Sequence, residues 1–197
     1  MTNYLYLIIG RSGAGKNTIV DELCKRYGYT KVRSYTTRQP LANEASTRHI
    51  YSDIDAYYEA KNNEDIAAET KIRGDYYWAT HDQIDNADFY IIDIEGIHSL
   101  KKHYKGSRPF KVIYIETDSN TCFNRMIQRL DNPTKEAVNE LVNRQHNDAV
   151  NFPEDSPLPY LIDYKVFNNN DLQTTVDTIY TTIISRLESQ YSTEGLN

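Results

Sequence analysis

Gly10-Arg11-Ser12-Gly13-Ala14-Gly15-Lys16-Asn17-Thr18 is the stretch that decides the predicted fold, because it follows directly on the apolar run 4–9. An apolar run, a glycine-rich turn and a helix start, in this order, indicate a buried strand, a tight loop and a helix. Gly10 and Gly15 have the spacing of a Walker A loop, and Gly13 lets the backbone curl so that its N–H groups face inward. The sequence therefore predicts a cradle for phosphate groups.

The predicted phosphate site combines backbone and side-chain donors. A helix that starts near Gly15 offers four unpaired N–H groups and the positive end of its dipole, and Lys16 adds a point charge for the outer phosphates. Such a site favours a polyphosphate nucleotide. The alternative is a glycine turn that only reverses the chain and leaves Lys16 in solvent, but the order of strand, loop and helix favours phosphate binding. The expected ATP phosphate-binding residues are Gly10, Ser12, Gly13, Ala14, Gly15, Lys16, Asn17 and Thr18.

One position departs from the Walker A pattern and bears on metal binding. The pattern has Ser or Thr after the lysine, whose hydroxyl ligates Mg²⁺, and this chain has Asn17. An amide oxygen is a hard ligand that Mg²⁺ accepts, and the hydroxyl of Thr18 is the alternative. Asp93 ends the predicted core strand 88–93, as the Walker B carboxylate does. The sequence therefore predicts Mg²⁺ as the cofactor, held by Asn17 and Asp93 directly or through water.

Length and composition exclude several classes of protein. The 197 residues include 39% apolar residues, enough for one compact domain with a small inserted lobe. No apolar stretch approaches the ~20 residues of a membrane span, and the N-terminus lacks the features of a signal peptide. We therefore expect a cytoplasmic protein with no membrane partner. Cys24 and Cys122 are the only cysteines, and both are expected to be buried free thiols.

The charge distribution favours a small anionic ligand over a nucleic acid. The net charge of −6 lacks the basic face that neutralises a nucleic-acid backbone. Residues 1–48 nevertheless hold 8 Lys and Arg against 3 Asp and Glu, whereas residues 49–100 hold 3 against 12. A basic N-terminal third in an acidic protein suits small anions, although solvated charged faces are the alternative interpretation.

Hydrophobic periodicity along the chain predicts an α/β class, a P-loop NTPase-type three-layer fold with a parallel sheet core, a small inserted α+β acceptor-binding lobe and a helical lid. Strands are expected at 4–9, 29–33, 88–93, 110–116 and 161–167. Helices are expected at 17–26, 53–60, 97–104, 133–150, from Asp118 onward, and along the apolar stripe Leu172, Val176, Ile179, Ile183 and Leu187.

The stretch from about 35 to 80 has a different pattern, with a short helix and two short strands, 66–73 and 76–78, joined by Gly74-Asp75. A hairpin of this kind does not belong to a parallel core. We therefore expect a single domain 1–197 with a core of 1–34, 80–125 and 160–190, an acceptor-binding lobe at 35–80 and a lid at about 126–158.

Three arginines on the predicted lid are candidates for phosphoryl binding. Arg125 and Arg129 stand four residues apart and are expected to share one helix face, and Arg144 lies on the helix 133–150. A single helix arginine usually faces solvent. Three of them on a cover over a phosphate loop favour binding to phosphoryl oxygens, which the guanidinium fork suits.

The order of the motifs resembles the guanylate kinase family of nucleoside monophosphate kinases, across nearly the whole chain. The resemblance is carried by 10–16, Ser34-Tyr35-Thr36-Thr37-Arg38-Gln39-Pro40, Arg73-Gly74-Asp75-Tyr76-Tyr77, Ile92-Asp93-Ile94-Glu95-Gly96 and 163–172. It implies that the loop around Ser34 and Arg38 and the hairpin with Tyr77 bind the acceptor nucleotide, with Arg38 on the acceptor phosphate.

The implied reaction is phosphoryl transfer from ATP-Mg to a nucleoside monophosphate, GMP or dGMP by default, which yields ADP and the diphosphate. This chemistry needs alignment of two anions and neutralisation of charge, but no general base. Closure of the lobe and the lid would exclude water. The expected catalytic residues are Lys16, Arg38, Arg125, Arg129 and Arg144.

Several family positions differ, and most lie on the acceptor side. Leu41 replaces a second arginine, Ala68 replaces the glutamate that reads guanine, Ala79 replaces the hairpin serine, and His49 stands at the place of a tyrosine. Base selectivity is therefore left open between GMP, another base and a broader range. The expected acceptor-binding residues are Ser34, Arg38, His49, Glu69, Tyr77, Thr80, Asp93 and Glu95.

Two other classes of function remain as alternatives. A related kinase for a sugar phosphate would explain the altered base-reading positions while it keeps Lys16 and Arg38. A non-catalytic guanylate-kinase-like binding module would explain Asn17 and Leu41, but it has no physical need of Lys16 and the three glycines. The predicted partners are ATP and a nucleoside monophosphate, without nucleic acid, and the sequence leaves monomer and homodimer open.

Overall fold

The computed structural model describes residues 1–40, 48–130, 134–152, 160–169 and 171–194. The chain divides into two compact units. Unit 1 comprises Met1–Leu7 and Tyr29–Phe110, and unit 2 comprises Ile8–Gly28 and Lys111–Asn197. Leu41 and the first residue of the helix predicted at 133–150 lie outside the described residues. Among the residues that are described, none of the helices has the length and apolar character that crossing a membrane requires.

The described strands form two four-stranded sheets. The order of the first sheet is β6-β1-β7-β8, and the order of the second is β3-β2-β5-β4. Their bounds are β1 Leu5–Ile9, β2 Tyr35–Thr36, β3 Ile50–Tyr51, β4 Ile66–Ile72, β5 Asp75–Thr80, β6 Phe89–Ile91, β7 Phe110–Glu116 and β8 Tyr164–Phe167. In the first sheet β7 and β8 are parallel, with Ile113 opposite Tyr164. The predicted α/β class with a parallel sheet core is confirmed.

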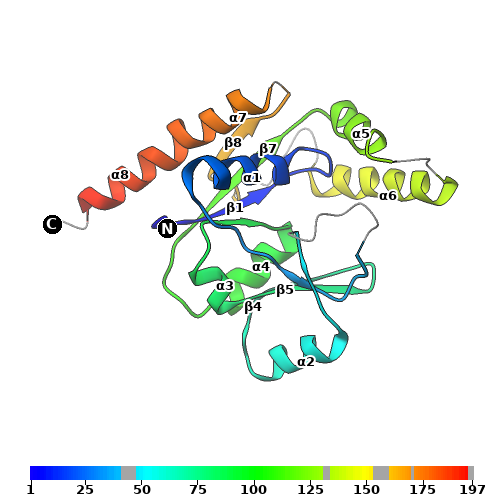
Figure 1. The fold of residues 1–197 in the computed structure, drawn as a ribbon, viewed down its shortest axis with the longest axis horizontal. Helices are drawn as coiled ribbons and strands as arrows, with labels where there is room; N and C mark the ends of the chain where they lie inside the picture. The colour runs from blue at the N-terminus through cyan, green and yellow to red at the C-terminus, as the bar shows by residue number, and fades with distance from the viewer. Residues whose placement is uncertain (41–47, 131–133, 153–159, 170, 195–197) are drawn as a thin grey trace. The chain divides into compact units, whose positions relative to one another are not determined.

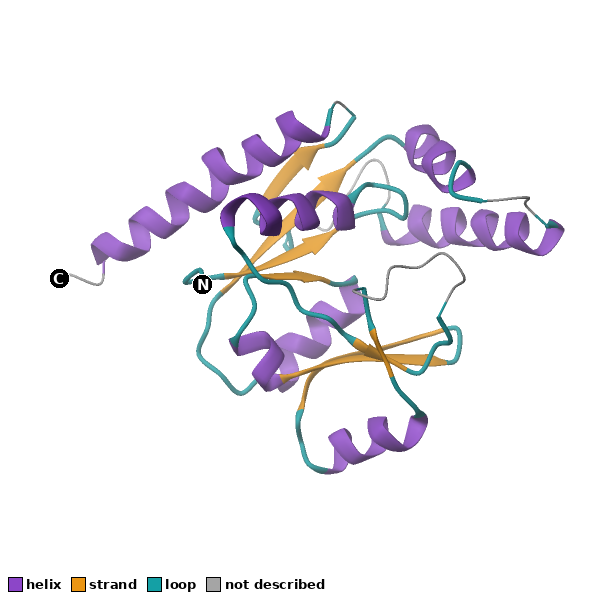
Figure 2. Cartoon of the chain, viewed as in Figure 1, coloured by secondary structure: helices purple, strands orange, loops and turns teal. Residues whose placement is uncertain are grey.

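Unit 1 is built around the second sheet. The helices α2 (Ile54–Asn62) and α4 (Ile94–His103) lie on opposite sides of the β4–β5 hairpin (Figures 1 and 2), with α2 against β5 and α4 against β4. The short helix α3 (His81–Asp85) follows β5. The Thr80 hydroxyl accepts the Gln83 N–H and the Gln83 side-chain oxygen accepts the Thr80 N–H, which is a capping box.

Unit 2 carries the glycine loop and the remaining helices. Its α1 (Lys16–Tyr27) packs on α7 (Leu172–Thr178) and ends at Gly28, whose left-handed φ of 71° closes the helix. The helix α5 (Ser119–Ile127) packs on α6 (Lys135–Asn151). Figure 2 shows α7, η1 (Ile179–Ile184) and α8 (Ser185–Glu194) as one long helix.

The predicted strand 29–33 is wrong, because only Lys31 forms a bridge, to Phe89. The Thr30 carbonyl accepts the N–H groups of both Asp88 and Phe89, and the Asp88 carboxylate accepts the Thr30 N–H at 2.8 Å. Burial raises the pKa of Asp88, but the hydrogen bonds from Thr30 and Thr2 outweigh this and lower it. The buried Asp88 carboxylate therefore accepts the Thr30 backbone N–H, which would otherwise be available to pair with a neighbouring strand.

The β4–β5 turn was placed one residue too late by the sequence. Its two residues are Arg73 and Gly74, with φ of 55° and 94°, so that Asp75 already belongs to β5. Two consecutive positive φ values are what a two-residue hairpin turn with the right-handed strand twist requires. The short strands β2 and β3 were not predicted at all, because two-residue strands carry no period.

Three helix boundaries also differ from the prediction. The helix expected at 97–104 begins at Ile94, because the Asp93 carboxylate caps it through the Gly96 N–H at 2.6 Å. Arg129 lies beyond the end of α5, so it does not share a face of that helix with Arg125. The last helix contains the π-helical segment η1, which the apolar stripe did not indicate.

Candidate functional site

The loop between β1 and α1 has the backbone that a phosphate cradle needs. Gly10, Gly13 and Gly15 have φ of 148°, 80° and 92°. A Cβ on Gly10 would lie 2.5 Å from the carbonyl oxygen of Ile115, and one on Gly13 would collide with the carbonyl oxygen of Cys122. Backbone atoms cannot move aside as a side chain can. Both positions therefore require glycine for conformation and for space.

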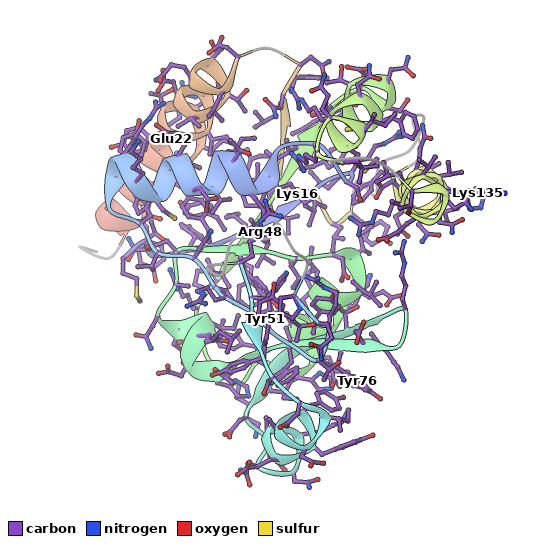
Figure 3. All side chains as sticks on the ribbon, turned by 45° about the vertical axis from the view of Figure 1, so that its right-hand side comes forward. Lys16, Glu22, Arg48, Tyr51, Tyr76 and Lys135 are labelled. Atoms are coloured by element: carbon purple, nitrogen blue, oxygen red, sulfur yellow. The ribbon has the colours of Figure 1, made fainter. Side chains whose placement is uncertain are left out.

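Lys16 lies at the first position of α1, as labelled in Figure 3. Its Nζ donates to the carbonyl oxygens of Gly10 at 2.6 Å and Arg11 at 2.9 Å, which holds the ammonium against the loop. Gly15 occupies the N-cap position and has no side chain to satisfy the first N–H groups of the helix. These donors and the lysine charge together suit an anion.

Arg125 extends from α5 to the same loop. Its Nη2 donates to the carbonyl oxygen of Asn168 at 3.3 Å, and the Asn168 amide in turn donates to Ala14 at 2.7 Å. Within the described part of the chain, the buried Nη1 has no hydrogen-bond partner, and a Cβ on Gly15 would lie 3.8 Å from it. A buried guanidinium N–H without an acceptor is costly, and an anion bound at the loop would supply one.

The other predicted residues of unit 2 lie in different surroundings. Asn17 is half-buried and Thr18 exposed in the first turn of α1. Arg144 of α6 pairs with Glu140 one turn earlier, with Nε 3.0 Å from Oε1. Arg129 is exposed. Of the three predicted lid arginines, Arg125 is the one that the described contacts bring to the glycine loop.

Unit 1 has a second cluster suited to an anion, around Arg38. The Arg38 Nε donates to the Tyr77 hydroxyl at 3.0 Å, and its guanidinium carbon lies 5.8 Å from the centre of the Tyr51 ring. The His49 ring stands edge-on to Tyr77 and Tyr51, with centroid distances of 5.5 and 6.4 Å. Tyr51 lies on β3, labelled in Figure 3. Sequence reasoning missed it together with that strand, and the alternation of His49 and Tyr51 is the signal that was available.

Ser34 lies just before β2 and is buried. Its hydroxyl donates to the Tyr90 hydroxyl at 3.3 Å, and burial raises the pKa of Tyr90 to about 12. The Thr80 hydroxyl, by contrast, caps α3 by accepting the Gln83 N–H. The pair Ser34–Tyr90 therefore offers neutral hydroxyl groups at the start of the Arg38 loop.

A carboxylate pair lies at the start of α4. Burial raises the pKa of Asp93, the hydrogen bonds from the Gly96 N–H and the Thr70 hydroxyl oppose this, and the negative charge of Glu95 raises it further. The Thr70 hydroxyl of β4 lies 3.5 Å from Glu95 Oε2. A raised pKa means that the negative charge of Asp93 is incompletely compensated. Either a cation or the N–H groups of a ligand would relieve this.

Glu69 points to other partners, on α2. Its carboxylate accepts the Tyr57 hydroxyl at 2.5 Å and the Lys61 ammonium at 3.0 and 3.1 Å. Burial raises the pKa of Glu69, but the hydrogen bonds from Tyr57 and Lys61 outweigh this and lower it. Three hydrogen bonds occupy the carboxylate, whereas Thr70 next to it in β4 faces Glu95.

The buried strand β1, the glycine loop and α1 place the chain in the class of P-loop α/β proteins. The chain belongs to the guanylate kinase family: the family's model, described as guanylate kinase, matches residues 2–186. The resemblance drawn from the motifs is confirmed.

Similar proteins agree with this assignment. The guanylate kinase of Clostridium acetobutylicum is 34% identical over 107 residues, 51% of each chain. That of Clostridium tetani is 32% identical over 132 residues, 64% of this chain and 62% of the relative. The chain thus spans between about half and three fifths of the length of these relatives. The crystal structure of guanylate kinase from Anaplasma phagocytophilum has the same fold, with a TM-score of 0.63 and 18% identity over 94% of this chain and 85% of that one.

Proposed function

We propose that this protein is an ATP-dependent guanylate kinase, a phosphotransferase that converts ATP and GMP or dGMP to ADP and the diphosphate. The observation that carries the proposal is the buried Arg125 Nη1, which has no acceptor in the described structure and lies beside Gly15. A guanidinium in that position completes a set of donors for a polyphosphate. Membership of the guanylate kinase family supports the same reaction.

In the proposed donor site, the N–H groups of 12–18 and the Lys16 ammonium hold the ATP phosphates. Lys16 leaves its two carbonyl partners and turns to the phosphate oxygens, because a negatively charged acceptor binds an ammonium more strongly than a neutral carbonyl does. Arg125 neutralises the charge that develops on the transferred phosphoryl group. Arg129 and Arg144 join it as parts of the proposed lid at about 126–158, for which Arg144 exchanges Glu140 for a phosphate.

Mg²⁺ is the proposed cofactor, and the residues present fit it. Asn17 offers an amide oxygen, and Asp93 has a carboxylate whose raised pKa a divalent cation would lower again. When bound with ATP, Mg²⁺ neutralises the phosphate charge. In unit 2, Asn17 would hold the ion or its waters, and the Asp93 carboxylate of unit 1 stays a candidate ligand from the sequence pattern.

In the proposed acceptor site, Arg38 binds the monophosphate, with Tyr77, His49 and the hydroxyl of Ser34 beside it. The bond from Arg38 to Tyr77 fixes the guanidinium plane before the ligand arrives, which lowers the entropy lost on binding. Tyr51 is added to this set, because its ring supports the same guanidinium. These residues belong to the lobe proposed at 35–80.

We assign recognition of the acceptor base to Glu95 and Asp93. Guanine presents adjacent N–H donors, and carboxylate oxygens are acceptors only. Two carboxylates at this place therefore favour guanine over a base that presents acceptors at that edge. Glu69 is assigned a structural role instead, because Tyr57 and Lys61 occupy its carboxylate. Thr80 serves the cap of α3.

The proposed mechanism is positioning and charge neutralisation in a site closed to water, without a general base. We place the protein in the cytoplasm, where ATP and GMP are its partners. The test is a coupled assay of ADP release with ATP, Mg²⁺ and each common nucleoside monophosphate. Turnover with GMP and dGMP, lost in Lys16→Ala, is the expected result. No turnover with any monophosphate would contradict the proposal.

A further inference from the structure

A carboxylate of the chain itself binds the glycine loop. Asp148, in the last turn of α6, accepts the backbone N–H of Ser12 through Oδ2 at 2.8 Å. Ser12 lies between Gly10 and Gly13, so its N–H is one of the donors that the Walker A spacing assigns to phosphate. A charged acceptor on a backbone N–H is a strong hydrogen bond. Asp148 therefore takes a donor that a nucleotide phosphate would use.

A second contact ties the same end of α6 to the loop. The buried Arg11 donates through Nη2 to the carbonyl oxygen of Phe152 at 2.5 Å. Phe152 caps α6 by donating its N–H to the Asp148 carbonyl at 2.8 Å, and its ring stacks on Tyr114 of β7, with centroids 5.5 Å apart. Arg11 and Ser12 are consecutive, and Asp148 and Phe152 are one turn apart. The two bonds therefore hold one turn of helix on two adjacent loop residues.

The charged side chains that act on Cys122, beside this contact, are mainly cations. Lys16, Arg125, Asp148 and Arg11 all act electrostatically on the buried thiol of Cys122, the residue whose carbonyl adjoins Gly13. Three are cations and the fourth is the Asp148 carboxylate. A carboxylate in this field is attracted as a phosphate would be, although it carries less charge and fewer acceptor oxygens.

We propose that Asp148 is an internal ligand of the glycine loop that competes with the triphosphate, so that nucleotide binding requires release of the end of α6. The proposal rests on the proposed function, because it takes the loop as the ATP site. A site that is vacant in only a fraction of the molecules binds its ligand more weakly by that same fraction. Asp148 thus lowers the affinity for ATP and couples its binding to movement of α6.

The test measures binding of ATP with Mg²⁺ to the full chain by calorimetry. Asp148→Asn keeps the size of the side chain and removes its charge, and Asp148→Ala removes the acceptor as well. Asp21→Asn is the matched control, because it removes the same charge from the exposed face of α1. Both Asp148 variants are expected to bind ATP about three- to tenfold more tightly than the wild type. This range corresponds to a wild-type loop that is free of Asp148 in about a third to a tenth of the molecules. The control is expected to bind as the wild type does.

Amide hydrogen exchange of the wild type supplies a second readout that needs no variant. ATP is expected to accelerate exchange of the Phe152 N–H, because release frees the last turn of α6, whereas the Ser12 N–H stays protected by phosphate in place of Asp148. Equal or weaker binding of ATP by the folded variants, or a Phe152 N–H that ATP protects further, would overturn the proposal. If the wild type binds no ATP, the proposed function itself fails, which is a separate result.

Discussion

The two units build their proposed anion sites in opposite ways. The site in unit 2 consists mainly of backbone N–H groups from one stretch, 10–18, and its geometry depends on glycines with left-handed φ. The proposed site in unit 1 consists of side chains on or next to β2, β3 and β5, which strand pairing brings together, and of carboxylates at the start of α4. A binding site built from backbone N–H groups does not tolerate an added Cβ at its glycines, whereas in a site built from side chains single residues can be substituted without moving the others. The departures from the family pattern accordingly lie mostly on the side-chain site.

Gly13→Ala is expected to have the largest effect, because it breaks the backbone site. The new Cβ would meet the Cys122 carbonyl at a φ of 80°, so the loop must shift. A misplacement of about 1 Å costs ~100-fold or more in turnover. Gly28→Ala is the matched control, since it has a similar φ of 71° but nothing within 4 Å. It should lose about 1–2 kcal/mol of unfolding free energy and keep its turnover. Coupled assays and urea unfolding measure both, and equal turnover in the two variants would contradict the comparison.

Arg38→Ala tests the side-chain site. Loss of a charged hydrogen-bonding group should raise the KM for GMP about 10- to 100-fold, with the KM for ATP unchanged. Arg186→Ala removes the same charge from an exposed residue of α8 and should change the KM for GMP less than twofold. A rise in the KM for ATP with Arg38→Ala would show that Arg38 acts on the donor instead.

Asp93→Asn should separate stability from function. Asn keeps an oxygen for the Gly96 N–H, so the cap of α4 remains. Turnover is expected to fall about 10- to 100-fold, as after loss of a group that orients a metal. Because the pKa of Asp93 is raised above 3.8 in the folded state, its ionisation lowers stability as the pH rises through that raised pKa.

The pH dependence of unfolding gives the second readout for Asp93→Asn. The variant lacks the decline in stability above the usual pKa of 3.8, so its unfolding free energy relative to wild type should increase between pH 4 and pH 7. Urea unfolding at each pH measures this difference. A variant that becomes relatively less stable towards pH 7 would mean that the charge of Asp93 is compensated within the fold.

Glu69→Gln should have the smallest effect. It tests whether Glu69 or Glu95 recognises the acceptor base. It weakens the half-exposed pair with Lys61 and should cost about 0.5–1 kcal/mol of unfolding free energy, with the KM for GMP unchanged. Because the pKa of Glu69 is lowered from 4.5, this stabilisation is present above pH 4.5 and is lost as the pH falls through the lowered value. Glu95→Gln, by contrast, should raise the KM for GMP. The reverse pattern would return base recognition to Glu69.

Much of the donor site could be predicted because it is local in sequence. The spacing of Gly10, Gly13 and Gly15 predicts a turn that only glycine can make, and the structure has a left-handed φ at each. Asp118, from which a helix was predicted, caps α5. A cap or a glycine turn is decided within about four residues of chain, so the sequence shows it directly.

The acceptor site could be predicted only in part, because strand register decides which residues meet. Glu69 and Thr70 are consecutive in β4 and pair regularly with Trp78 and Tyr77 of β5, so their side chains lie on opposite faces, Glu69 against α2 and Thr70 against Glu95. Sequence spacing suggested Glu69 as a substitute reader of the base, since it stands one place from Ala68. One residue along a strand reverses the face on which a side chain lies.

By itself the sequence determined the family, the glycine loop, most of the helices and the core strands, because periodicity, caps and turns act over a few residues. Only the tertiary structure decided that Arg125 contacts the loop, that Tyr51 lies beside Arg38, that Glu69 of β4 pairs with residues of α2, and that Asp148 binds Ser12. These contacts join residues far apart in the chain. Their partners are set by packing and register, which no local pattern encodes.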